Sequence, residues 1–351
     1  MMRAKLFSLF AVLLLLMGFA FAQEDEGVTI TLVTHDSFNV SEEVLAAFTE
    51  ETGITVEILR AGDAGQMLNQ SILSKNNPLG DVLFGVDNTF LSRALEADLF
   101  VPYESPLLEG IPEEFILDEE HRVTPMDYGD VCLNYDITYF EEHDLPIPES
   151  LADLTDPAYK GLLVVQNPAT SSPGLAFLLA TIAEFGTEGD YTYLDFWTDL
   201  IENDVIITDG WSEAYFNYFT VPSEDGDRPL VVSYASSPPV EFFFAEDLEE
   251  PTTAAIVADG TCFRQIEFAG ILAGTEHEEE AQQLIDFLLS EPFQEDMPLQ
   301  MFVFPVNPEA ELPEIFAQYA AIPENPAALD YADIEANREE WIEAWTEAVL
   351  R

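Results

Sequence analysis

The fold is decided near the N-terminus, where residues 28–38 have the sequence VTITLVTHDSF. Val28, Ile30 and Leu32 alternate with threonine, and this period of two is typical of a β-strand with one buried face. The strand is predicted to end in a polar loop. A helix is expected after the plausible N-cap Ser41, because apolar residues then recur on one helical face.

The following residues repeat this strand and helix pattern. Alternation over residues 54–58 predicts a second strand, residues 67–73 a helix, and the apolar run 81–85 a buried strand. The order βαβαβ implies a parallel sheet. Ligands of such sheets bind beyond the carboxyl ends of the strands, so three loops are expected to line one rim: 34–38, 62–66 and 85–88.

A second α/β pattern begins after Asp127-Tyr128-Gly129, with a strand expected at 162–166 and an apolar helix after Pro173. A chain of 351 residues with 48% hydrophobic residues can bury a large core, and its length favours two lobes over one. We therefore predict an α/β fold of two lobes. The expected boundaries place the first lobe in two pieces and the second lobe between them: 23–125, 126–264 and 265–351.

Two later segments show helical spacing of apolar residues. We interpret both stripes as core, although two tryptophans spaced i and i+4 could in principle line a ligand site. The stripes consist of Ala281, Leu284, Ile285 and Leu288, and of Ile334, Trp341 and Trp345.

The first 22 residues have the pattern of a secretory signal peptide. Arg3 and Lys5 precede an apolar run over 6–19, and Ala20-Phe21-Ala22 has small residues where the peptidase cuts. The run is shorter than the roughly 20 residues of a membrane span, so an uncleaved anchor is disfavoured. No cysteine lies nearby to carry a lipid. We expect cleavage after Ala22 and export to the periplasm.

The composition is strongly acidic, with 68 Asp and Glu against 11 Lys and Arg and a formal net charge of −57. Such a surface repels nucleic acid and favours cationic ligands. Adaptation to salty surroundings would produce the same composition. Acidity alone therefore selects no ligand.

The chain contains no motif of a nucleophile elbow, phosphate loop, zinc-binding helix or EF-hand. Its four histidines lack metal-ligand spacing, and acidic residues are too abundant to single out a catalytic pair. We expect no enzyme, no cofactor and no metal. The histidines are His35, His121, His143 and His277.

Cys132 and Cys262 are the two cysteines of a chain expected in an oxidising compartment. Both lie near the expected crossings between the lobes. A disulfide is possible if the crossing strands are neighbours, and two buried free thiols are the alternative.

Three later loops are rich in hydroxyl groups or aromatic rings. Hydroxyls and free N–H groups at a helix start suit a phosphate or hydroxyl group, whereas Trp and Tyr faces suit a flat ring or a cation. Each loop alone could equally be an ordinary turn. The loops span residues 166–174, 209–215 and 233–238.

Taken in order, these blocks resemble the thiamine-binding periplasmic proteins of thiamine ABC transporters over nearly the whole chain. Gly-Trp-Ser-Glu-Ala-Tyr at 210–215 is the most specific block. The others are Asp36-Ser37-Phe38, Asp87-Asn88, Asp127-Tyr128-Gly129, Thr170 to Gly174, Ser233 to Pro238 and Phe304-Pro305-Val306. The resemblance implies a type II periplasmic-binding fold, two lobes joined by a hinge, with thiamine or its phosphates held between them.

The resemblance also implies the ligand contacts. Trp211 and Tyr234 would stack on the ligand, and a loop with Asp63 and Ala64 would complete the site. The phosphate or hydroxyethyl end would be bound by Ser171, Ser172, Ala235, Ser236 and Ser237. Further lining is expected from His35, Asp87 and Phe302. Fewer rings than usual are expected, because His35, Val240 and Phe302 occupy positions where the family can carry Tyr, Tyr and Trp.

Two other ligand classes fit the same fold. A ferric-iron binder would need a close tyrosine pair, but Ala235 follows Tyr234. A polyamine binder would need carboxylates and aromatic walls, which Asp63, Asp87, Trp211 and Tyr234 could supply. We expect a monomer that closes on thiamine and delivers it to a membrane permease with its partner ATPase.

Overall fold

The computed structural model describes residues 27–243 and 248–351, so the predicted signal peptide, residues 1–22, lies outside the described residues. Within this part of the chain one mixed sheet holds every named strand. Its main path has the order β2-β1-β3-β10-β5-β8-β6-β7, and β4, β9 and β11 pair beside it. The strands are β1 (Thr29–Thr34), β2 (Thr55–Arg60), β3 (Val82–Asp87), β4 (Phe100–Val101), β5 (Thr124–Asp136), β6 (Leu163–Gln166), β7 (Ile206–Thr208), β8 (Leu230–Tyr234), β9 (Thr253–Ile256), β10 (Phe263–Leu272) and β11 (Phe304–Pro305).

The N-terminal βαβαβ prediction is confirmed. Strand β1 pairs in parallel with β2 on one side and with β3 on the other. Thr34 at the end of β1 is opposite Arg60 of β2 and Phe84 of β3. The loops that follow β1 and β2 therefore open at the same edge of the sheet.

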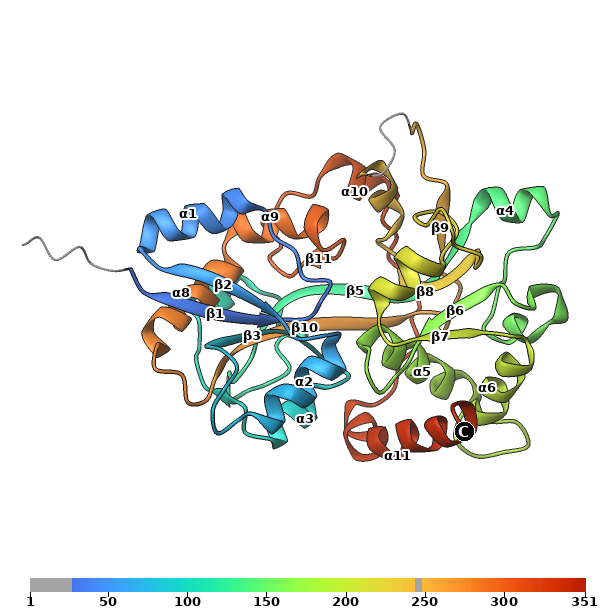
Figure 1. The fold of residues 1–351 in the computed structure, drawn as a ribbon, viewed down its shortest axis with the longest axis horizontal. Coiled ribbons are helices and arrows are strands. Elements are labelled where there is room, and N and C mark those ends of the chain that lie inside the picture. The colour runs from blue at the N-terminus through green and yellow to red at the C-terminus, as the bar shows by residue number, and fades with distance from the viewer. Residues whose placement is uncertain (1–26, 244–247) are drawn as a thin grey trace, which may run out of the picture.

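Two long antiparallel strands, β5 and β10, run through the middle of the molecule and join its two halves (Figure 1). Strand β10 pairs with β3 of the first half, and β5 pairs with β8 of the second half. Beyond β8, strands β6 and β7 continue the second half in parallel pairing. The two-lobe α/β prediction is thus confirmed, with the lobes joined by crossing strands.

Helices cover both faces of the sheet. In the first half α1 and α9 lie on one side of the strands, and α2 and α3 on the other (Figure 1). The α-helices are α1 (Glu42–Thr52), α2 (Ala64–Leu73), α3 (Leu91–Glu96), α4 (Ile137–Glu142), α5 (Ser172–Phe185), α6 (Tyr193–Glu202), α7 (Trp211–Glu213), α8 (Glu278–Leu289), α9 (Glu291–Gln300), α10 (Glu314–Tyr319) and α11 (Tyr331–Val349). Short 3-10 helices are η1 (Pro106–Gly110), η2 (Glu113–Phe115), η3 (Ala152–Thr155), η4 (Pro157–Tyr159) and η6 (Pro238–Phe243), and η5 (Ala214–Tyr218) is a π-helix.

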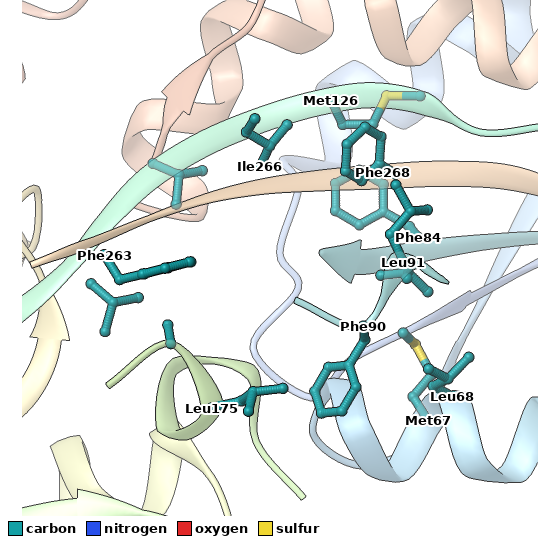
Figure 2. Packing of buried hydrophobic residues seen from close by; sticks show 14 of the residues in the cluster. Met67, Leu68, Phe84, Phe90, Leu91, Met126, Leu175, Phe263, Ile266 and Phe268 are labelled. Atoms are coloured by element: carbon teal, nitrogen blue, oxygen red, sulfur yellow. The ribbon is translucent and has the colours of Figure 1, made fainter. Parts of the chain in front are cut away.

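The core lies between these helices and the sheet. Figure 2 shows Met67 and Leu68 of α2 beneath the strands and Phe268 of β10 above Phe84 of β3. Each fully buried side chain of this size contributes roughly 1.5–3 kcal/mol. The predicted apolar stripe of α8 is buried, as are Ile334 and Trp345 of α11, and Trp341 packs half-buried against the same core. Interpreting these stripes as core was therefore correct.

The C-terminal helix α11 contacts both halves. The guanidinium group of Arg338 donates to Thr89 O and to Ser92 Oγ in the first half. Trp345 meets Trp197 of α6 in the second half edge to face, with ring centroids 5.3 Å apart. Across the described ranges, 27–243 and 248–351, no helix is both long and apolar enough to span a membrane.

Cys132 and Cys262 form a disulfide between the two crossing segments. Cys132 lies in β5, and Cys262 directly precedes β10, whose first residue Phe263 pairs with Val131. This pairing brings the two Cα atoms to 4.3 Å, within reach of a disulfide. The neighbouring crossing strands required by the disulfide hypothesis are thus present.

Candidate functional site

A cavity of about 350 Å³ lies at the edge of the sheet where the two halves face each other. This volume is in the range of small-molecule sites. Both halves supply its walls. The lining residues of the first half are His35, Asp36, Ser37, Phe38, Asn39, Arg60, Asp63, Ala64, Glu267, Gln300, Met301, Phe302 and Val303, and those of the second half are Ser172, Pro173, Trp211, Ser212, Phe216, Tyr234 and Ser237.

His35 is held in the cavity wall by the bend that follows β1. Gly85 in β3 has a φ of +101°, and a Cβ atom at that position would overlap the His35 ring, so glycine makes room for it. His35 Nε2 lies 3.5 Å from Glu267 Oε1. Burial alone would lower the pKa of His35, but the carboxylates of Glu267, Asp63 and Asp36 outweigh burial and raise it.

Asp63 ties the two halves together across the cavity. As the N-cap of α2 its Oδ1 accepts the N–H of Ala64 at 2.7 Å, and its Oδ2 accepts the N–H of Trp211 from the other half at 3.0 Å. Burial raises the pKa of Asp63, while these two N–H groups and His35 partly offset the effect. The carboxylate is therefore both a helix cap and a latch between the halves.

Two further contacts cross the same boundary. Gly65 of α2 donates its N–H to Thr170 O at 3.1 Å, and the hydroxyl groups of Ser37 and Ser212 are 3.0 Å apart. A Cβ atom at Gly65 would lie 3.0 Å from Thr170 O, and one at Gly210 would lie 2.8 Å from Asp63 Oδ2. Glycine at these two positions permits the close approach of the halves.

Trp211 presents a fixed ring to the cavity. Its Nε1–H donates to Ser233 Oγ at 2.9 Å, and its ring stacks on Tyr215 with centroids 4.8 Å apart and planes at 19°. Tyr215 is fully buried in the π-helix η5. π-Helical turns occur often at functional sites. The indole ring is therefore held in a fixed orientation in the cavity wall.

Tyr234 lies at the end of β8, where Gly129 leaves room for it: a Cβ atom at Gly129 would be 2.8 Å from Tyr234 Cδ1. The phenol donates to Gln265 Oε1 at 2.8 Å. Burial, followed by the nearby carboxylates of Glu267 and Asp87, raises the pKa of Tyr234 well above its usual value. The phenol therefore stays protonated.

The structure brings most of the predicted contacts together. Eight of the sequence-predicted residues line the cavity: Asp63, Ala64, Ser172, Trp211, Tyr234 and Ser237, with His35 and Phe302 from the additional set.

Four predicted contacts lie behind the lining instead. Ser171 is fully buried just before α5, and Ala235 packs against the disulfide. Ser236 is turned away from the cavity and donates to Phe302 O at 2.6 Å. Asp87 belongs to β3 rather than to a rim loop, and its carboxylate accepts from Thr89 Oγ1 and Gln265 Nε2. Val240 is also in the core.

Several lining residues were missed by the sequence reasoning, above all Glu267, Arg60 and Phe216. Gln265-Ile266-Glu267 alternates polar and apolar residues, which would have predicted a strand with both polar side chains on one face. Nothing local distinguishes Glu267 among 68 acidic residues. In the part of the chain that the structure describes, no three metal-ligating side chains come together.

The sequence matches a family of known proteins. A model of the bacterial extracellular solute-binding protein family matches residues 77–325. The chain belongs to this family. As in other solute-binding proteins, the cavity between its two lobes is the place expected for the solute.

The resemblance found in the sequence is confirmed over nearly the full length of this solute-binding protein. It is 27% identical to the thiamine-binding periplasmic protein of Escherichia coli K12 over 92% of this chain and 94% of that protein. It is 29% identical to the thiamine-binding periplasmic protein of Brucella suis over 98% of both chains. A solved periplasmic thiamin binding protein superposes with a TM-score of 0.80, 27% identity and coverage of 92% and 96%. The predicted type II periplasmic-binding fold is thereby confirmed.

Proposed function

We propose that this chain is the thiamine-binding component of an ABC importer and binds thiamine in the cavity between its lobes. The observation that carries the proposal is the cavity's pairing of a fixed indole ring, Trp211, with the carboxyl groups of Asp63 and Glu267. Thiamine carries a flat, positively charged thiazolium ring. Stacking of a cationic ring on tryptophan contributes about 0.5–2 kcal/mol, and carboxylates supply the opposite charge. The similarity to thiamine-binding relatives supports the same ligand.

The far end of the ligand would meet two helix starts. Ala64 opens α2, and Ser172 and Pro173 open α5, all of them in the cavity lining. The positive end of a helix dipole suits a hydroxyl or phosphate group. We therefore propose Ser172 and Ser237 as hydroxyl contacts. Ser236 would act by holding Phe302 in place.

The mechanism we propose is closure of the lobes around thiamine, followed by recognition of the closed form by a permease with its ATPase. We place the signal peptide at 1–22, the first lobe at 23–125 and 265–351, and the second lobe at 126–264. The protein would be located in the periplasm. It would act as a monomer without a cofactor. The contacts of Asp63 with Trp211 and of Gly65 with Thr170 support closure, because they join the two halves.

The geometry argues against ferric iron as the ligand. A ferric-iron site would need a close tyrosine pair, but Ala235 follows Tyr234, and the phenol of Tyr234 already donates to Gln265. A polyamine is the second candidate, favoured by the carboxyl groups of Asp63 and Glu267 in the lining. A polyamine has no flat ring to use the preorganised face of Trp211.

Calorimetry of the mature chain with thiamine, thiamine monophosphate, putrescine and ferric citrate tests the proposal. Thiamine or its phosphate should bind with a Kd below about 10 μM, equivalent to roughly −7 kcal/mol. If putrescine binds more tightly than either thiamine form, the proposed ligand becomes a polyamine. If neither thiamine form binds at this level, thiamine is not the ligand.

A further inference from the structure

Three carboxyl groups stand side by side across the central strands at the bottom of the cavity. In the sheet register Glu267 of β10 is opposite Asp87 of β3 on one side and Asp127 of β5 on the other. Residues directly opposite each other project from the same face of a sheet. Asp87, Glu267 and Asp127 therefore form one line, here called the carboxyl row.

The carboxyl row is almost completely buried. Asp87 is 0% exposed, Asp127 1% and Glu267 7%, and of the three only Glu267 lines the cavity. Asp87 accepts hydrogen bonds from Thr89, Phe90 and Gln265. Among the described residues, no N–H or hydroxyl group donates to either oxygen of Asp127, whose neighbour in the row is the carboxyl group of Glu267. The inner end of the row thus lacks the donors that normally stabilise a buried carboxylate.

Two basic side chains, Arg60 and His35, line the same cavity as Glu267. Within residues 27–243 and 248–351, no lysine or arginine forms an ion pair with any member of the row. His35, 3.5 Å from Glu267, is the basic partner. The other titratable groups that interact with the row or with His35 come from the loop after β1, the start of α2, β8 and α11: Asp36, Asp63, Tyr234 and Tyr331.

The sheet is locally distorted at this point. The register of β10 against β5 shifts between Glu267 and Phe268, and its register against β3 shifts between Phe268 and Ala269. Such bulges are frequent beside binding sites, where they redirect a side chain. The two bulges next to Glu267 therefore help to set the direction of its side chain.

We propose that the carboxyl row is the cation-selective floor of the cavity, and that a cationic ligand seated at Glu267 displaces a proton from the row. This inference rests on the proposed function and adds its selectivity: the floor favours a charged ring over a neutral ring of the same shape. Glu267 supplies the contacting carboxylate, and Asp127 and Asp87 hold the exchangeable proton.

Three adjacent buried carboxylates repel each other, and this repulsion favours protonation of the row. Burial raises the pKa of Asp87 to about 6, with Glu267 adding to the effect. Burial and then Glu267 raise the pKa of Asp127 well above its usual value. A bound cation lowers these pKa values, so a carboxyl O–H bond breaks and the proton passes to the buffer. Affinity for the cation therefore increases as pH rises through 6.

Calorimetry of the mature wild-type chain at pH 6.5 in two buffers of different ionisation enthalpy measures the proton directly. Thiamine should release about 0.3–1 proton per ligand bound, because the pKa of Asp87 is about 6 and that of Asp127 is also raised. The neutral hydroxymethylpyrimidine half of thiamine should release essentially none. Thiamine that binds without proton release overturns this inference and leaves the proposed function standing. A chain that binds no thiamine refutes both.

Variants separate the row from His35, which would also lose a proton to an incoming cation. Asp127→Asn and Asp87→Asn, made singly and together, should abolish most of the release if the row is its source. Unchanged release in the double variant would assign the proton to His35 and overturn the inference. Glu267→Gln should weaken thiamine about tenfold or more and the neutral pyrimidine less than about threefold, as expected for loss of a partly desolvated charge pair. If thiamine and the neutral pyrimidine lost the same factor in affinity, Glu267 would only position the ligand and would not select for its charge. Glu278→Gln, an exposed carboxyl in α8, is the matched control and should change neither quantity.

Discussion

Replacing Gly210 with alanine should hold the lobes apart. Gly210 has φ −159° and ψ 169°, an extended conformation that alanine adopts without strain. The added Cβ atom, however, would lie 2.8 Å from Asp63 Oδ2 and 3.3 Å from Asp63 Cβ in the other half. The unfavourable free energy of Gly210→Ala therefore arises from the contact between the halves and not from backbone strain.

The size of the effect follows from the atom that is displaced. Asp63 Oδ2 is the acceptor for Trp211 N–H at 3.0 Å, so moving it breaks the latch. A hydrogen bond to a charged group contributes about 1.5–3 kcal/mol. Because this bond exists only when the halves meet, its loss weakens binding by closure about 10- to 100-fold.

Titration calorimetry with thiamine measures this loss, and thermal unfolding of the empty protein shows whether the variant is folded. Gly110→Ala is the matched control, because a Cβ atom there meets nothing within 4 Å. It should bind as tightly as the wild type. A Gly210→Ala variant whose Kd stays within about twofold of the wild type would refute the latch.

Three other changes test separate parts of the structure. Trp211→Ala should weaken thiamine binding by about 1 kcal/mol or more, as expected for a lost stacked ring, and Trp211→Phe by less; unchanged calorimetric affinity would remove Trp211 from the site. Thiol titration of the denatured, unreduced chain should find no free thiol, and joint replacement of Cys132 and Cys262 by serine should lower the free energy of unfolding by about 4 kcal/mol in urea, given their separation of 130 residues. For Asp127 the raised pKa means that the folded state binds its proton more tightly, so stability is lost as pH rises through the folded-state pKa. Asp127→Asn should therefore raise the unfolding midpoint by about 2 °C or more at pH 8 and by less at pH 5, and an equal change at both would contradict this sign.

The elements around the first lobe could be predicted because their signals are local. The alternation around Ile30 and the apolar spacing near Phe48 depend on a few neighbouring residues, and both agree with β1 and α1. Loops 34–38 and 62–66 reach the cavity because the carboxyl ends of paired parallel strands share one edge. Trp211 could be predicted because the block at residues 210–215 resembles the family. Composition alone would not have selected it.

The floor of the site could not be predicted in this way. Whether Asp87 ends in a rim loop or in a strand depends on β10, which pairs with it from about 180 residues later in the chain. The bulges beside Glu267 shift the register, and a one-residue shift exchanges the two faces of a strand. Ser171 and Ser236 matched the expected motif, yet packing buries Ser171 and engages the hydroxyl group of Ser236 with Phe302 O, so neither residue lines the cavity. Side-chain direction at these positions is a tertiary property.

The acidity of the chain and its selectivity for a cation have different physical origins. Most of the 68 acidic residues are outside the cavity lining, where salt screens exposed charges over about 8 Å at physiological ionic strength. Such charges steer a cation towards the protein but hardly discriminate between bound ligands. Discrimination requires carboxyl groups that are removed from water and adjacent to the ligand, because only there is their interaction weakly screened. Asp63 and Glu267 meet this condition, and so two carboxyl groups, rather than a net charge of −57, should decide which ring the cavity holds.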